Sequence, residues 1–469
     1  MELVADGNLL KSRGVKPASI LLQQVRERRR AFDELDPTWF WEIHRFPSDV
    51  TRYEINSGFL GHGINSTSSE HFRGVRYRRL LPPSLQRPDH VWEDVGFTMA
   101  DLSFDFSEDL QVLVEQTVDR KQRRLRFKTI STNAPHPSAR NPTVLLQEID
   151  FAFWDSCSTL LYGDYLAIGF SQWDRSNTYI EGCQMVINWK TGELSLPSME
   201  TLDLAFLSES LILLIFEANP LCLGLYNLRK QTTIKRFTLP FSQPLASAFF
   251  LTHPPYKPDP FVSSIVSEKL VSDTALDIIG MLLTPSWSGG QDIYIVLSGR
   301  KFLRRALILC EIFPDKNCFN WEEWGPDVTR WFPPQMIQDV GFRGVFGSRM
   351  IAKGNLAARS ASGTEDTLVL FDFNPRPITR GSYGDVGSDF TRIVVEEEWS
   401  WSDALDPSGM AVKSRLPFRA ITPNKPLKYH YEDIYLDLNT IVGRTMDSYH
   451  LFSFLPRPEG EAPKESRFL

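Results

Sequence analysis

The chain has 469 residues, of which 42% are hydrophobic and 12% aromatic, so it carries enough apolar material for a large folded core and far too much for a disordered protein. Its formal net charge of −7 argues against a general nucleic-acid-binding surface. The 31 prolines and 28 glycines are scattered along the chain and favour many short strands over long helices.

The cysteines and the apolar stretches indicate the compartment. Five cysteines are widely spaced without a C-x-x-C pair, which predicts reduced thiols in the cytoplasm or nucleus. The first residues lack the basic start and apolar run of a signal peptide. The most apolar stretch, 204–225, is interrupted by Glu209, Glu217 and Pro220, so we interpret it as buried strands and not as a membrane span. We therefore expect an intracellular protein with neither a membrane nor a nucleic acid as its partner.

The first predicted element is a helix within residues 16–37. Apolar residues recur there at helical spacing from Ala18 to Leu35, with arginines on the wetter side. Pro17 suits the first helical position, and Pro37 ends the pattern. We expect one amphipathic helix of about five turns within an N-terminal segment, 1–48. Its basic run is interpreted as a solvated face, with a nuclear signal or a partner site as the alternative.

From about residue 50 onward the apolar period changes to two, which predicts strands. Segment 102–116 followed by 123–130 indicates a pair of strands around a turn at 119–122. In 151–170, Gly163-Asp164 indicates a tight turn between two strands. The sequence QMVINWKTGELSLP then closes that unit. The cycle repeats at 204–218 with 221–240, and at 342–352 with 367–377.

Three strand ends share one pattern, in VINWKTG, LYNLRKQ and LFDFNPR. Each has a large apolar residue, then Asn188, Asn227 or Asp372, then another large apolar residue and a polar turn. These polar side chains are able to accept hydrogen bonds from the backbone of the following turn. The strands before them also match, as YLAIGF, LILLIF and SRMIAK. Four short strands every ~40–50 residues are typical of a β-propeller, in which each sheet covers its neighbour.

The sequence therefore predicts an all-β fold, a β-propeller preceded by the amphipathic helix. We assign the propeller to 49–455, with about seven blades and six as the alternative, and a flexible tail to 456–469. Segments 252–274 and 312–340 are interpreted as insertions. A β-sandwich or two smaller β domains remain as alternative architectures.

Several of these motifs resemble one protein family. ELVADGN (2–8), LLQQVRERRRAFDEL (21–35) and GDYLAIGFSQ followed by QMVINWKTGEL resemble the F-box proteins of mushroom-forming fungi. The resemblance implies a helical linker, a propeller-like β region, and a substrate receptor of a cullin ubiquitin ligase. In that family an F-box binds a Skp-type adaptor and precedes ELVADGN. No F-box is visible in this sequence, so we expect it to be truncated or lost, and the partner to be a target protein and not the adaptor.

No catalytic, metal-ligating or cofactor-binding residue is assigned. The chain has no H-E-x-x-H, G-x-S-x-G or phosphate-loop motif. Gly61-His62-Gly63 with His71 is the densest histidine cluster, and we interpret it as a loop between strands, with a metal or base role as the alternative. Carboxylates are plentiful, so a propeller hydrolase acting on glycosides or esters stays open as the second functional hypothesis.

Aromatic residues in expected loops are the better functional signal. Trp173, Arg175 and Tyr179 in SQWDRSNTY and Trp287 in TPSWSGGQ are our candidates for partner binding, because interfaces favour Trp, Tyr and Arg. Packing between blades is the alternative for the tryptophans. A second cluster, Trp321, Trp324 and Trp331, is interpreted as fastening an insertion to the blades. The leading functional hypothesis is a non-enzymatic protein-interaction module.

Overall fold

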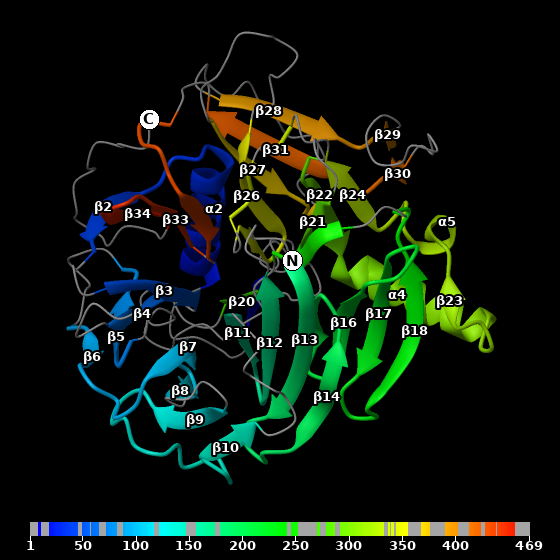
Figure 1. The fold of residues 1–469 in the computed structure, drawn as a ribbon. Helices are drawn as coiled ribbons and strands as arrows, with labels where there is room; N and C mark the ends of the chain where they lie inside the picture. Colours follow the sequence, from blue (N-terminus) through cyan, green and yellow to red (C-terminus); the bar gives the residue numbers. More distant parts are fainter. Residues whose placement is uncertain are drawn as a thin grey trace.

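The computed structural model confirms a β-propeller of seven blades (Figure 1). It describes residues 8–454 apart from the segments 11–17, 46–48, 57, 65–71, 82–87, 117–121, 147–155, 174–178, 242–244, 252–269, 273–277, 287–290, 333–335, 338, 342–343, 355–366, 376–389, 402–411, 424–426 and 438. The predicted tail, 456–469, lies outside the described residues.

Each blade is one sheet whose strands follow one another from the centre of the ring outward. Blade 1 contains β3 (Asp49–Asn56), β4 (Phe59–Ile64), β5 (Gly74–Arg79) and β6 (His90–Trp92). Blade 2 contains β7 (Met99–Asp105), β8 (Leu110–Gln116), β9 (Arg123–Thr129) and β10 (Thr143–Leu146). Blade 3 contains β11 (Ser156–Tyr162), β12 (Tyr165–Trp173), β13 (Tyr179–Asn188) and β14 (Leu194–Glu200).

The next three blades are less regular. Blade 4 contains β15 (Asp203–Ser208), β16 (Leu211–Phe216), β17 (Cys222–Asn227), β18 (Thr232–Thr238) and the added strand β23 (Cys318–Phe319). Blade 5 contains β19 (Leu245–Phe250), β21 (Ile278–Pro285), β22 (Ile293–Ser298) and β24 (Thr329–Phe332). Blade 6 contains β25 (Val345–Phe346), β26 (Arg349–Gly354), β27 (Thr367–Asp372), β31 (Phe418–Pro423) and β28 (Phe390–Val395).

Blade 7 closes the ring with strands from both ends of the folded chain. It contains β32 (Asp433–Leu436), β33 (Thr440–Arg444), β34 (Ser448–Ser453) and, outermost, β2 (Trp39–His44). β2 pairs with β34 over six residues, from Trp39 opposite Ser453 to His44 opposite Ser448. The sequence pattern places these N-terminal residues in the segment 1–48, outside the repeat. The strand they form nevertheless completes a propeller sheet.

Three helices and two strand pairs lie outside the seven blades in the described chain. They are α2 (Ala18–Asp33), α4 (Gly299–Ile312), α5 (Trp321–Trp324), β1 (Asn8–Leu10) with β20 (Leu270–Ser272), and β29 (Trp399–Trp401) with β30 (Val412–Ser414). The helix predicted within 16–37 is confirmed as α2. The helix α4 was not predicted, because residues 293–312 were taken as part of the repeat.

Apolar packing is divided into seven clusters, one for each junction between neighbouring blades. One cluster, for example, joins Val112 of β8 to Ile168 of β12, and the next joins Val186 of β13 to Leu214 of β16. The other five clusters fill the remaining junctions in the same way. A four-stranded sheet alone leaves its faces open to water, so this radial stacking supplies the apolar burial that stabilises the fold.

The predicted side-chain bonds at the strand ends are present. Asn188 Oδ1 accepts hydrogen bonds from the backbone N–H groups of Lys190 and Thr191 at 3.1 and 3.0 Å. Asn227 Oδ1 accepts one from Lys230, and Asp372 Oδ1 accepts one from Asn374. All three residues end the third strand of a blade, so the common pattern marks the same structural position in blades 3, 4 and 6.

The apolar residue after the third strand has a second role. Its N–H donates to a carbonyl in the turn between the first and second strands of the same blade, as from Trp189 to Asp164 at 3.0 Å. The bond recurs in six blades, with N···O distances of 2.7–3.0 Å and a buried donor residue each time. The donors are Leu80, Ile130, Trp189, Leu228, Phe373 and Phe454, and the acceptors are Gly58, Asp109, Asp164, Ser210, Ser348 and Asn439.

One predicted turn is wrong. Residues 102–116 form two strands, β7 and β8, because a turn at 106–109 divides them. Asp109 occupies a positive φ of 53° there, a conformation that Asp tolerates better than most residues. The predicted turn at Gly163-Asp164 is confirmed, with Gly163 at a φ of 55°.

Helix α2 is fastened to the junction of blades 6 and 7 at its C-terminal end. Phe32 stacks on Phe454 with ring centroids 3.9 Å apart. The carboxylate of Asp33 lies 2.5 Å from the guanidinium of Arg419, which also binds Asp372 at 2.8 Å. Arg419 and Asp372 are both almost fully buried. Burial alone would raise the pKa of Asp372, but Arg419, Arg349 and the N–H of Asn374 hold this pKa below its ordinary value.

Replacing Arg419 tests this anchor. Arg419→Met leaves the Asp372 carboxylate buried without its main counter-charge, and we expect the free energy of unfolding to fall by about 3–5 kcal/mol. Asp33→Asn is the matched control and should cost about 1 kcal/mol, because it removes only the outer partner. Urea unfolding followed by tryptophan fluorescence measures both. Equal losses for the two variants would contradict the anchor.

Candidate protein-interaction surfaces

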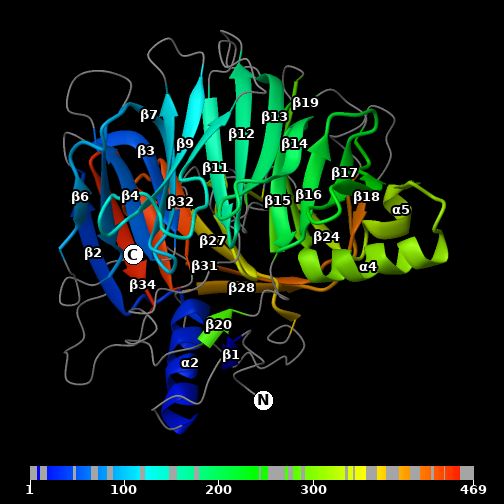
Figure 2. The same cartoon turned by 90° about the horizontal axis from the view of Figure 1, so that it is seen from below.

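The propeller has two unlike faces, because antiparallel strands return the chain alternately to one side and the other. On the helix face lie the turns between first and second strands, together with α2, α4 and the β1–β20 pair (Figure 2). The opposite side, which we call the loop face, carries the connections from second to third strands. The two faces are therefore the surfaces on which a partner could be recognised.

The four predicted partner-binding residues belong to loop-face connections. Trp173 ends β12 and lies opposite Tyr179 at the start of β13, after a register shift at Gln172. The side chains of Trp173 and Tyr179, like all of Arg175 and Trp287, lie outside what the structure describes. The strands β21 and β22 flank the connection that contains Trp287, and they reach the same face. The partner-binding role of the four residues stays a prediction.

The second tryptophan cluster is structural. Trp321, Trp324 and Trp331 are buried, with ring centroids 5.2–5.5 Å apart in edge-to-face pairs. Trp324 Nε1 donates to the carbonyl of Thr238 at 3.0 Å, which joins α5 to blade 4. These residues fasten the insertion between β22 and β24, as the sequence predicted.

Helix α4 presents an exposed face that the sequence pattern did not reveal. Its buried side chains, Phe302, Ala306 and Leu309, pack into the cluster between blades 4 and 5. The opposite side exposes Leu307 by 66% and Ile312 by 60%, with Ile308 and Phe313 beside them. The described chain exposes eight large hydrophobic residues, and four of them gather on this helix. The signal in the sequence was the run LRRALILCEIF, whose apolar residues fall on both sides of a helix.

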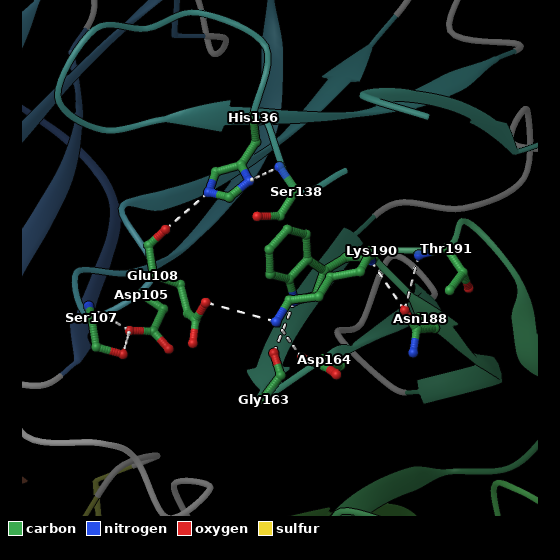
Figure 3. Close-up of polar contacts among 11 residues, drawn as sticks. Asp105, Ser107, Glu108, His136, Ser138, Gly163, Asp164, Asn188, Lys190 and Thr191 are labelled. Atoms are coloured by element: carbon green, nitrogen blue, oxygen red, sulfur yellow. Dashed lines mark hydrogen bonds and ion pairs between the residues drawn. The ribbon is translucent and has the colours of Figure 1, made fainter. Parts of the chain in front are cut away.

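The densest polar cluster lies at the helix-face turns between blades 2 and 3 (Figure 3). The backbone N–H of Ser138 donates to His136 Nδ1 at 3.2 Å, so the imidazole proton is on Nε2, which lies 2.9 Å from the carbonyl oxygen of Glu108. The ring packs edge-on against Trp189 at 4.9 Å. Both ring nitrogens are therefore engaged in backbone bonds, and His136 has no lone pair left to act as a base.

The charged residues of this cluster are also engaged. Lys190 Nζ lies 2.7 Å from Asp164 and 3.7 Å from Glu108, and 5.2 Å from the Trp189 ring centroid. Trp189 Nε1 donates to the carbonyl of Gly163 at 2.9 Å (Figure 3). These contacts tie the third-strand turn of blade 3 to its own first turn and to blade 2. The cluster is a seal between blades and not an assembled catalytic site.

His62 lies in strand β4 and not in the predicted loop. It is 3% exposed, and its ring faces Tyr449 at 5.4 Å and Tyr53 at 6.2 Å. Burial, with Arg45, Arg78 and Arg76 adding to it, lowers the pKa of His62 to about 3. The imidazole is therefore neutral near pH 7. Its partner in the predicted cluster, His71, lies outside the described residues.

Asp203 is the second group with a strongly displaced pKa. Although part of the residue is accessible, its carboxyl group is enclosed, and this burial raises the pKa to about 7. Two backbone N–H groups, of Leu204 and Phe250, donate to its oxygens at 2.8 and 2.7 Å and oppose the rise. Phe250 ends β19, so Asp203 bridges the innermost strands of blades 4 and 5.

Metal ligation and membrane insertion find no support in the described chain. No group of three or more His, Cys, Asp or Glu is close enough there to hold a metal ion. No described helix combines the length and apolar character that crossing a membrane requires. All five cysteines are free thiols.

The sequence matches no protein-family model, and no curated protein matches it. Among solved structures, the WD40 domain of Toxoplasma gondii coronin is similar, with 9% identity, 91% of this chain and 90% of that chain covered, and a TM-score of 0.40. The β-propeller domain of Myceliophteria thermophila Cps50 (Swd1) has 10% identity, coverages of 88% and 99%, and a TM-score of 0.41. The likeness extends no further than the fold, which the strand pairing of this chain defines by itself.

The displaced pKa of His62 predicts how stability depends on pH. A histidine in the unfolded chain takes up a proton near pH 6.5, but the folded one does so only near 3. The unfolded state therefore binds more protons between these values, and the free energy of unfolding falls as the pH drops below 6.5, by about 1.4 kcal/mol per pH unit from this group.

His62→Phe isolates that contribution from other titrating groups. We expect the wild type to lose stability relative to the variant as the pH falls from 6.5 to 4.5, and the difference to be constant above pH 7. Urea unfolding of both proteins at four pH values measures this. Parallel curves over the whole range would rule out a buried neutral His62.

Proposed function

We propose that this propeller is a non-enzymatic protein-interaction module that holds a target protein on its loop face, in the manner of the substrate-recognition region of an F-box receptor. The observation that carries the proposal is the division of the ring into two faces. Helix α2 is fastened on one face through Phe32 and Asp33, and the connections containing Trp173 and Trp287 leave the other. A receptor needs this separation, because target and ligase machinery must be held apart in a fixed orientation.

The chemistry of the described residues favours binding over catalysis. A hydrolase needs titratable groups that converge with free lone pairs and displaced pKa values. In the densest cluster, His136, Lys190 and the carboxylates already have partners. The two strongly displaced groups, His62 and Asp203, lie in different blade junctions. This arrangement supports the interaction module over the alternative hydrolase.

The assignment to the F-box receptors depends on the resemblance alone. Its most specific residues, GDYLAIGFSQ and QMVINWKTGEL, form β12, β13 and the Asn188 turn, where their side chains are largely buried. They thus support a shared blade design, and the partner remains to be identified by experiment. Intracellular placement is part of the same proposal.

A capture experiment with matched variants tests the proposal. The 469-residue chain is immobilised beside Trp173→Ala/Trp287→Ala and a control, Val394→Ala, whose side chain is exposed on β28. We expect target proteins captured from lysate by the wild type to be reduced at least tenfold by the double variant and unchanged by the control, because aromatic anchors carry most interface energy. Unfolding temperatures should be equal.

Two outcomes would contradict this account. Equal capture by the double variant would remove the loop face as the binding surface. Turnover of p-nitrophenyl glycosides or esters by the purified wild type would favour the hydrolase. A Skp-type adaptor is not expected among the captured proteins, and direct binding of purified adaptor to the chain would overturn that part of the proposal.

A further inference from the structure

The exposed side of α4 has a regular order of side chains. Positions 300, 304, 307 and 311 form one stripe along the helix, and positions 301, 305, 308 and 312 form the next. In each stripe two basic residues precede the exposed apolar ones. The four basic residues are Arg300, Lys301, Arg304 and Arg305, and the apolar ones are Leu307, Ile308 and Ile312, with Phe313 directly after the helix.

This charge pattern opposes the stability of α4 itself. The N-terminal end of a helix carries a partial positive charge, which acidic residues stabilise. The first turn of α4 has no acidic residue, its N-cap Ser298 makes no side-chain cap bond, and four cations occupy the first seven residues. Arg300 and Arg304 stand one turn apart, where like charges repel. The helix is held instead by its buried face, so the basic residues are suited to an external anion.

The surface is also rigidly mounted. Phe302 packs edge-on against Phe237 and Trp324 at 5.0 and 5.5 Å. Arg305 Nε donates to the carbonyl of Glu323 at 2.7 Å, which joins α4 to α5. A fixed helix binds at a lower entropic cost than a mobile one.

We propose that the exposed face of α4 binds an acidic amphipathic peptide segment of another protein, with carboxylates opposite residues 300–305 and apolar side chains opposite residues 307–313. The face measures about 20 Å along the helix, which suits a helical segment of about four turns. Exposed apolar area joined to a rim of one charge is the usual character of such a docking site.

Two other occupants fit less well. An anionic membrane would meet Glu311 inside the apolar half and a chain of net charge −7. A second copy of the chain would bring the same basic stripes against each other in a two-fold contact of this face. Charge complementarity therefore favours the acidic peptide. This surface lies on the helix face, so the inference goes beyond the loop-face function proposed above.

Peptide display tests the chemistry of the partner directly. A library of random 16-residue peptides is selected against the full-length chain, and enriched peptides are measured by fluorescence anisotropy. We expect enriched sequences to combine net negative charge with leucine, isoleucine or phenylalanine. Arg300→Glu/Arg304→Glu should weaken their binding at least tenfold, and Leu307→Ser/Ile312→Ser should do the same.

Controls separate binding from folding. The double charge reversal is expected to keep or raise the unfolding temperature, because glutamate suits the start of a helix. Met446→Ser, which alters a 76% exposed residue elsewhere, should leave binding unchanged, as should Trp173→Ala/Trp287→Ala on the loop face. The inference is therefore tested separately from the proposed function.

Three results would overturn the inference. The first is enrichment of neutral or basic peptides, or of acidic peptides that bind the charge-reversed variant equally well. The second is sedimentation of the chain with vesicles of phosphatidylcholine and phosphatidylserine that Leu307→Ser/Ile312→Ser abolishes. The third is a dimer in sedimentation velocity that the same variant converts to monomer.

Discussion

The pairing of β2 with β34 joins the beginning of the folded chain to its end. Six residue pairs hold Trp39–His44 against Ser448–Ser453, and Trp41 and Ile43 enter the cluster between blades 7 and 1. Without this strand, blade 7 would expose an open edge, and the junction with blade 1 would lose apolar burial. The pairing also sets the position of α2, which directly precedes β2 and is held on the helix face. The division into two faces therefore depends on it.

Within each blade, a short repeat connects sequence to structure. A polar side chain at the end of the third strand fixes the following turn, and the next apolar residue binds back to the first turn while its side chain is buried. Trp189 shows how these links combine, since its N–H, its indole and its ring contact the first turn, the same blade and His136 of blade 2. This position tolerates Trp, Leu, Phe or Ile, and that tolerance explains why the repeat is so degenerate in sequence.

The architecture was predictable from sequence where local chemistry repeats. The Asn188, Asn227 and Asp372 turns and helix α2 were found correctly, because turn formers and helical spacing are local signals. Strand β2 was not assigned to the propeller, since its pairing with β34 spans most of the chain and leaves no local mark. Helix α4 was missed because its exposed apolar residues hide the amphipathic period. The buried His62 was taken for a loop because its glycine neighbours suggest turns. The predicted partner-binding residues stay predictions.

Closure of the ring is the central claim, and an engineered cross-link tests it most directly. Glu42 and His450 lie opposite each other in the β2–β34 pair, and the chain has no native disulfide. In Glu42→Cys/His450→Cys, mild oxidation of the native protein should give an intrachain disulfide in peptide mapping and a raised unfolding temperature. Failure of these cysteines to cross-link in the folded chain, or cross-linking only after denaturation, would contradict a closed propeller.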